Sequence, residues 1–267
     1  MGNERDPRHD PQPIIDRFTT LCATDERVVA GFLGGSHARG DADEHSDLDL
    51  CVIVEDEEYE DVVAAREDLV RHLGDPLFLE DFGLSGIVFF VLADGTEGEI
   101  FFARASRLDD IDAGPHRTLF DPGGILDGVT FPGGSVDAVN QETAARQVLF
   151  WFWHELSHFI AAVGRGHLWW AAGQLEALRG CCVDLARLEQ GVEVGDEPYD
   201  KVDVAIRTAV LVPLVSTFVP IDRGALLEAG RTVVAHFRDR APEVAEAYGV
   251  NYPVELEHLV CARLDAL

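Results

Sequence analysis

Lysine is almost absent from this chain: Lys201 is the single lysine among 267 residues, and 21 basic side chains stand against 49 acidic ones. The formal net charge is therefore −28 at pH 7. A surface this acidic repels phosphate backbones and anionic lipid headgroups. The composition thus predicts a protein with no nucleic-acid partner and no membrane partner.

Other missing features further limit the class of protein to which this sequence can belong. No apolar run reaches the length of a membrane span, and the opening residues MGNERDPRHDP lack the basic-then-apolar layout of a signal peptide. The five cysteines form no C-x-x-C spacing. We therefore expect a cytoplasmic protein with reduced, mostly buried thiols; the oligomeric state stays open.

The excess of acidic residues has two interpretations. It could attract a cationic substrate, or it could be the acidic surface typical of salt-adapted proteomes, in which arginine replaces lysine. The acids are spread over the whole chain and do not gather near one site. This spread favours the halophilic-like surface.

The first half of the chain alternates short apolar runs with helical patterns. Strands are predicted at residues 28–33, 48–55, 87–92 and 98–103, and helices at 11–23 and 59–73. The pair Asp94-Gly95 between the last two strands is a hairpin turn signal. These elements predict an α/β (α+β) unit with a mixed sheet.

Residues 121–135, DPGGILDGVTFPGGS, are rich in glycine, proline and aspartate and fit a connection between domains. Beyond them, helical patterns cover residues 136–163, 168–190, 202–219, 224–240 and 253–267. We predict an α/β domain at residues 1–125, followed by an all-α helical bundle at residues 126–267.

The segment FLGGSHARGDADEHSDLDLCVIV, residues 32–54, carries the chemistry. A strand ends in Gly34-Gly35-Ser36, where missing side chains let backbone N–H groups approach an anion. Ser36 can cap a following helix and donate its hydroxyl. The turn therefore has the properties of a phosphate-binding site.

Two carboxylates follow, Asp47 and Asp49, at the start of the next strand. The strand period of two places both on one face, with Leu48 buried between them. Such a pair can hold Mg²⁺, which completes its shell with phosphate oxygens and water.

These two features together match the pattern h-G-S-x-A-R-G…S-D-x-D-h. The matching residues are Gly35, Ser36, Ala38, Arg39, Gly40, Ser46, Asp47 and Asp49. Over roughly the first half of the chain the pattern resembles the polymerase-β-type nucleotidyltransferase superfamily. Residues 165–180, RGHLWWAAGQLEALRG, more loosely resemble the helical C-terminal domains of aminoglycoside- and streptomycin-type nucleotidyltransferases.

The resemblance implies a nucleotidyltransferase core that moves a nucleoside monophosphate from a nucleoside triphosphate to an acceptor and releases pyrophosphate. It implies two Mg²⁺ ions, with Asp47, Asp49 and a third carboxylate as catalytic and metal-binding residues. Gly35, Ser36, Arg39 and Ser46 would bind the nucleotide or its phosphates; pairing of Arg39 with Asp41 or Asp43 is an equal alternative for that side chain.

The predicted third carboxylate is Glu99, an acid in the apolar run Gly98 to Phe102, where a charge is costly unless a metal or partner neutralises it. Glu97, on the same strand face, is the alternative. Many members of the superfamily have aspartate here, so the glutamate is a departure. Glu99 could bind metal, act as general base, or do both; otherwise a helical glutamate, Glu142, Glu155 or Glu176, could be the base.

The sequence also contains His154-Glu155-Leu156-Ser157-His158, which matches the H-E-x-x-H pattern of zinc proteases. On a helix the two histidines share a face. The flanking residues are apolar on most sides, as expected in a bundle interior, so hydrogen-bonded structural residues are favoured over a zinc site. Trp169 and Trp170 are likewise predicted in the core or an interface.

The leading hypothesis is an enzyme that transfers a nucleotide, AMP above all, to a hydroxyl of a small, antibiotic-like molecule. The alternatives are a protein-modifying enzyme of the toxin–antitoxin type and a catalytically silent nucleotide-binding protein. A zinc hydrolase ranks last.

Overall fold

The computed structural model describes residues 10–132, 138–195 and 197–267, and its contacts divide the chain into two compact units, residues 1–135 and 136–267. The units divide later than the predicted boundary at residue 125. Leu126 and Phe131 are buried in one cluster with Phe32 of the first strand, which joins this connection to the first unit. The domain boundary itself stays a prediction.

The first unit is built on a mixed sheet, which confirms the predicted fold class. Its strand order is β3-β4-β5-β2-β1-β6, with β2 and β5 parallel and the other neighbours antiparallel. The strands are β1 (Val28–Leu33), β2 (Leu48–Val54), β3 (Pro76–Glu80), β4 (Ile87–Leu92), β5 (Glu97–Arg104) and β6 (Arg117–Phe120). The hairpin turn at Asp94-Gly95 joins β4 to β5, as predicted, and Gly95 has a φ of 89°.

The two edge strands, β3 and β6, are absent from the sequence-based prediction. The first begins with a proline, which edge strands tolerate, and the second has only four residues, too few for a periodic pattern. The helix predicted at residues 59–73 is two helices, α3 (Tyr59–Ala64) and α4 (Arg66–Leu73), because the backbone leaves helical geometry at Ala65.

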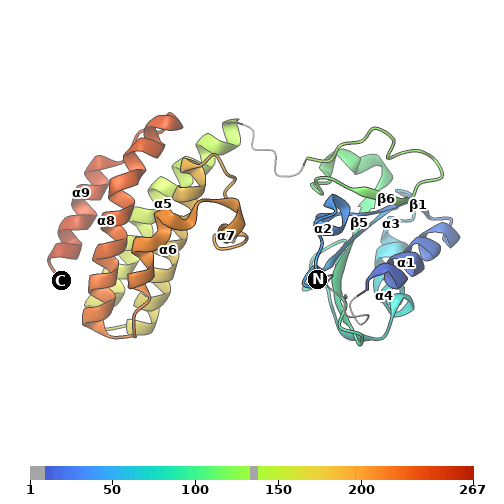
Figure 1. Ribbon diagram of the computed structural model, residues 1–267, viewed down its shortest axis with the longest axis horizontal. Coiled ribbons are helices and arrows are strands. Elements are labelled where there is room, and N and C mark those ends of the chain that lie inside the picture. Colours follow the sequence, from blue (N-terminus) through green and yellow to red (C-terminus); the bar gives the residue numbers. More distant parts are fainter. Residues whose placement is uncertain (1–9, 133–137, 196) are drawn as a thin grey trace, which may run out of the picture. The chain divides into compact units, whose positions relative to one another are not determined.

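The two faces of the sheet have different coverings. On β2, Leu48 and Leu50 pack in the core with helices α1 (Gln12–Thr24), α3 and α4, which lie on one face (Figure 1). Cys51 and Ile53 point to the other face, where the chain from the 3₁₀ helix η2 (Ala105–Asp110) to Phe131 covers them. By the two-residue period, Asp49 belongs to this second face, toward the end of the strand.

The second unit is helical, as predicted, and its long helices pack side by side around one core (Figure 1). They are α5 (Ala138–Gly164), α6 (Leu168–Glu189), α8 (Arg223–Ala247) and α9 (Val254–Asp265). Phe152 stacks on Phe237 with ring centroids 3.6 Å apart, which ties α5 to α8. Gly230 of α8 faces the ring of Phe159, and an added Cβ there would lie 2.5 Å from that ring.

The helix predicted at residues 202–219 is wrong. The structure has a single turn, α7 (Val202–Ala205), then the 3₁₀ helix η3 (Thr208–Thr217). Ile206 is extended between them, and Pro213 removes a backbone donor from an α-helical ladder. In contrast, α8 continues past its predicted end at Arg240 and includes Pro242.

Burial of the cysteines is confirmed for Cys22, Cys51, Cys181 and Cys182, and all five thiols are free. Trp169 and Trp170 do not lie in the core, since their side chains are 82% and 39% exposed, and an interface position stays a prediction. In the described residues, no helix is both long enough and apolar enough to cross a membrane.

Candidate active site

The register of two parallel strands brings the predicted acids together. Asp49 of β2 is the pairing partner of Glu99 of β5, and Leu48, buried as predicted, pairs with Gly98. Adjacent strands lie about 4.8 Å apart, and residues in register point to the same face. Asp47, two residues before Asp49 and exposed, extends the same row into the loop.

This proximity affects the electrostatics of Glu99. Glu99 is half-buried, and burial raises the pKa of its carboxyl above the usual range, with the charges of Asp49 and Asp47 raising it further. No cation is among the causes of that shift. Acids that perturb one another in this way favour a cation between them.

The glycine turn lies directly against Asp49. The Gly34 N–H donates a 2.8 Å hydrogen bond to the Asp49 carbonyl, which joins the turn to β2. Gly35 has a φ of 54°, and a Cβ built on it would overlap the Asp49 carboxylate. Only glycine therefore lets this carboxylate and the turn lie so close.

The helix that follows the turn, α2 (Gly35–Arg39), has only five residues. Its first turn has no side-chain cap, so the expected capping by Ser36 is not observed. The Ser36 carbonyl instead accepts N–H bonds from Gly40 and Asp41.

The loop between α2 and β2 is held by its own side chains. The Ser46 hydroxyl donates to the Asp43 carboxylate at 3.2 Å and accepts from the Asp43 N–H at 2.9 Å. Arg39 pairs with Asp41 at 3.3 Å, and both side chains are exposed. Thus Ser46 shapes the loop, and Arg39 adopts the ion pair that was its alternative interpretation.

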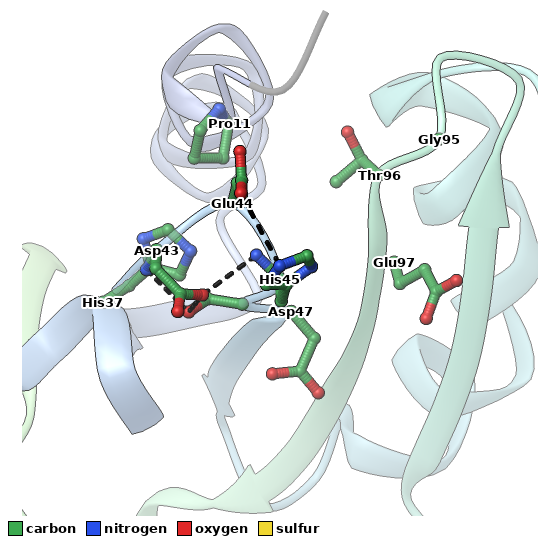
Figure 2. Close-up of a pocket in the computed structure, with 10 residues that line it drawn as sticks. Pro11, His37, Asp43, Glu44, His45, Asp47, Gly95, Thr96 and Glu97 are labelled. Carbon is green, nitrogen blue, oxygen red and sulfur yellow. Dashed lines mark hydrogen bonds and ion pairs between the residues drawn. The ribbon is translucent and has the colours of Figure 1, made fainter. Parts of the chain in front are cut away.

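A cavity of about 320 Å³ lies beside Asp47. Figure 2 shows the loop residues Asp43 to Asp47 on one side and Gly95 and Thr96 of the β4–β5 turn on the other. Glu97 lines this cavity, whereas Glu99 lies further along β5, in register with Asp49. The two candidate acids of β5 therefore have separate surroundings.

Sequence reasoning missed His37, which lines the same cavity. Its pKa is lowered by burial and by the nearby Arg117 charge, and partly restored by Asp49 and Asp47. The Nε2 atom of His37 is buried and has no hydrogen-bond partner among the described residues. The only sequence signal was its position inside the G-S-x-A-R-G pattern.

The alternative bases lie on helices of the second unit. Glu142 is exposed on α5, and Glu176 on α6 pairs with Arg179. Glu155 is buried on α5, beside His154 and His158. None of the three belongs to the unit that contains Asp47 and Asp49.

The site can be tested for its fit to magnesium. Mg²⁺ prefers oxygen ligands and needs only one or two carboxylates besides phosphate and water. Asp49 and Glu99 offer carboxylate oxygens from one face of the sheet, and Asp47 offers its own from the loop before β2. The pKa of Glu99 is raised first by burial and then by these two acidic neighbours. The donor set fits this ion.

Comparison with known proteins agrees with this geometry. Residues 15–84 match the nucleotidyltransferase domain family, a range that contains the Gly35 turn, Asp47 and Asp49. The match ends before β5, so it does not cover Glu99, whose assignment depends on the strand register and on its surroundings. No curated protein matches the chain.

Two solved structures are similar at low identity. An aminoglycoside 6-adenyltransferase from Bacillus subtilis is 14% identical, with 98% of each chain covered and a TM-score of 0.43. A nucleotidyltransferase-like protein from Exiguobacterium sibiricum 255-15 is 11% identical, with 89% of this chain and 77% of that chain covered and a TM-score of 0.41. The domain match over residues 15–84 supports a nucleotidyltransferase enzyme whose first unit resembles the polymerase-β-type superfamily, and the carboxylate geometry fits this resemblance.

Proposed function

We propose that this enzyme transfers a nucleoside monophosphate, AMP in the first instance, from a magnesium-bound nucleoside triphosphate to a hydroxyl of a small, antibiotic-like molecule. The observation that carries the proposal is the pairing of Asp49 with Glu99 on parallel strands, beside Asp47 and against the Gly35 turn. A phosphate-binding turn and a row of carboxylates at one end of a sheet are the two parts that nucleotidyl transfer needs.

Each residue has a role that its surroundings support. Asp47 and Asp49 hold magnesium, and the backbone at Gly35 and Ser36 binds the triphosphate, with Arg39 and Ser46 at the edge of the loop. Glu99, whose pKa is raised by burial and by its two acidic neighbours, accepts the proton of the acceptor hydroxyl or completes a second metal site. Bound magnesium neutralises phosphate charge and polarises the phosphoryl group.

The cavity beside Asp47 supports a small-molecule acceptor. Its volume of about 320 Å³ is at the lower end of the range of small-molecule sites. Its lining includes Asp43, Glu44 and Glu97, so a nucleic acid would meet repulsion there. The absence of a nucleic-acid partner and the cytoplasmic location remain predictions.

Release of pyrophosphate from each nucleoside triphosphate tests the proposal, measured with and without a panel of hydroxyl-bearing antibiotics. We expect release that requires both magnesium and one class of acceptor, and that disappears in the Asp47→Asn/Asp49→Asn variant. Mass spectrometry of the acceptor should then show the added nucleotide.

The same assay separates the alternatives. Label from the α-phosphate that appears on a protein would identify the protein-modifying type. Magnesium-dependent nucleotide binding without any turnover would identify a silent nucleotide-binding protein. Either result would contradict the proposal that the acceptor is a small molecule.

A further inference from the structure

A second group of ligand-type side chains lies on α5, in the unit that lacks the nucleotidyltransferase motifs. His154, Glu155 and His158 each offer one donor atom, and these three atoms lie within 4.8 Å of one another. The two imidazole rings are 4.4 Å apart, as expected for histidines one helical turn apart. All three residues lie on α5, so the geometry of the group requires only that this segment is helical.

The carboxylate at its centre is buried. The Glu155 side chain is 9% exposed, and its Oε1 atom lies 3.1 Å from Nδ1 of His154 and 3.9 Å from Nδ1 of His158. Among the described residues, no arginine or lysine lies within ion-pair distance of it. Burial of a carboxylate is costly unless a cation compensates it, and here only the two imidazoles are close.

The histidines, in contrast, are open to solvent. Their side chains are 52% and 45% exposed, so an ion from solution can reach them. Trp151 stacks on the His154 ring at 4.9 Å, and Trp170 of α6 lies 6.1 Å from the His158 ring. Neither histidine is therefore the buried bundle residue that the apolar flanking sequence predicted.

We propose that His154, Glu155 and His158 bind a divalent transition-metal ion of the zinc class. Imidazole and carboxylate ligands suit this class, with Zn–N distances of about 2.0–2.1 Å and Zn–O distances of about 2.0–2.2 Å. Two ligands on one tetrahedral ion lie roughly 3.3 Å apart at these bond lengths, so only small side-chain rotations would close the site. The three residues leave one position open for water or an outside ligand.

The site differs from the magnesium site in ligand type and place. Nitrogen donors favour zinc over magnesium, which prefers oxygen. Because all three ligands are on α5, the proposal does not depend on the proposed nucleotidyl transfer.

Zinc binding to the full chain tests the inference. The chain should carry no affinity-tag histidines, be stripped with a chelator, and be titrated with Zn²⁺ in high salt and excess Mg²⁺ to suppress non-specific binding to its acidic surface. We expect one tightly held zinc per chain by mass spectrometry, and a visible Co²⁺ spectrum of tetrahedral type.

Variants distinguish a defined zinc site from non-specific binding of zinc by surface histidines. His154→Gln/His158→Gln should lose the stoichiometric ion, and Glu155→Gln should weaken its binding by at least the roughly 10-fold that loss of an outer-shell partner costs, because Glu155 is a direct ligand. His167→Gln, a change at a neighbouring helix start, and Asp47→Asn/Asp49→Asn should retain it. The two histidines are half-exposed, so the double variant should fold, which circular dichroism checks. Absence of bound zinc, equal binding by the double histidine variant, or equal loss in His167→Gln would overturn the proposal.

Discussion

The two candidate metal sites described above are assembled in different ways. Asp49 and Glu99 come from strands distant in sequence and meet because β2 and β5 pair in parallel register. Glu155 and its histidines come from five consecutive residues of one helix. The first cluster therefore requires the whole sheet, whereas the second requires only that α5 is helical.

The difference also concerns what neutralises the acids. The pKa of Glu99 is raised first by burial and then by the charges of Asp49 and Asp47, and no cation contributes to its shift. Glu155 has two imidazoles beside it. A cluster of acids is suited to Mg²⁺ with phosphate, and a mixed cluster is suited to a zinc-class ion.

The largest expected effect comes from a substitution in the glycine turn that lies against Asp49. Gly35→Ala should reduce nucleotidyl transfer at least about 100-fold, since the new Cβ overlaps the Asp49 carboxylate and displaces it. Initial-rate measurements check this. Gly83→Ala is the matched control, because Gly83 also has positive φ, has no atom within 4 Å of a built Cβ, and does not line the cavity beside Asp47. Both changes carry the backbone cost of about 1–2 kcal/mol, so equal loss of activity in the two variants would contradict the account.

The next prediction separates the two acids of β5. Glu99→Gln should lower kcat by about 100-fold or more with little change in the KM for nucleotide, as for loss of a proton acceptor. Glu97→Gln, which lines the cavity but does not pair with Asp49, should mainly raise the KM for the acceptor. Steady-state kinetics with both substrates varied decide between them; a larger kcat effect in Glu97→Gln would exchange the two assignments.

The third prediction concerns a buried carboxyl group of the helical unit, Asp184, and its effect on folding stability. Burial raises the pKa of Asp184 to about 6, and its Oδ1 atom has no hydrogen-bond partner among the described residues. Because this pKa is above its unfolded value, the folded state binds more protons between about pH 4 and 6, and stability falls as pH rises through that window. Asp184→Asn should therefore stabilise the protein by about 1–3 kcal/mol at pH 8 and change little at pH 4.

Urea unfolding at the two pH values measures this difference. Asp203→Asn, at an exposed position, controls for the change in net charge. Equal stabilisation by both variants would assign the effect to the overall charge of the chain.

The smallest expected effect concerns Arg39. Its exposed ion pair with Asp41 contributes less than about 1 kcal/mol. Arg39→Gln should weaken binding of the magnesium-bound nucleotide only about threefold, measured by calorimetry. A loss of nucleotide affinity as large as that of Asp47→Asn/Asp49→Asn would place Arg39 on the phosphates and contradict its assignment to the loop.

Most of the strand-built cluster could be proposed from the sequence because its motif depends on local features of the chain, and its role as a site stays a prediction. A glycine turn, a two-residue spacing and an apolar strand define Gly35, Asp47 and Asp49 with no knowledge of the sheet. Glu99 was predicted from its apolar surroundings, and only the register of β5 against β2 distinguishes it from Glu97. His37 and its neighbour Arg117 carry no pattern of their own, because their proximity depends on β6.

In the second unit, the sequence predicted the long helices but not which of their side chains are exposed. Helical periodicity predicted the long helices, but the flanking aromatic residues suggested a helix that is apolar on most sides, with its histidines in the bundle interior. Exposure of His154, His158 and Trp169 depends on which neighbours pack against each face, and periodicity alone does not contain that information. The extended backbone at Ile206 likewise interrupts an apolar pattern that reads as one helix.

The most direct test of the central claim is calorimetric titration of nucleoside triphosphates into the protein, with and without Mg²⁺, at high salt. The account predicts binding that requires Mg²⁺, is lost in Asp47→Asn/Asp49→Asn, and is retained in Asp16→Asn/Asp61→Asn, which makes the same charge change at exposed helix positions. Binding that is indifferent to Mg²⁺, or that survives loss of both site aspartates, would contradict the assignment of these residues to nucleotidyl transfer.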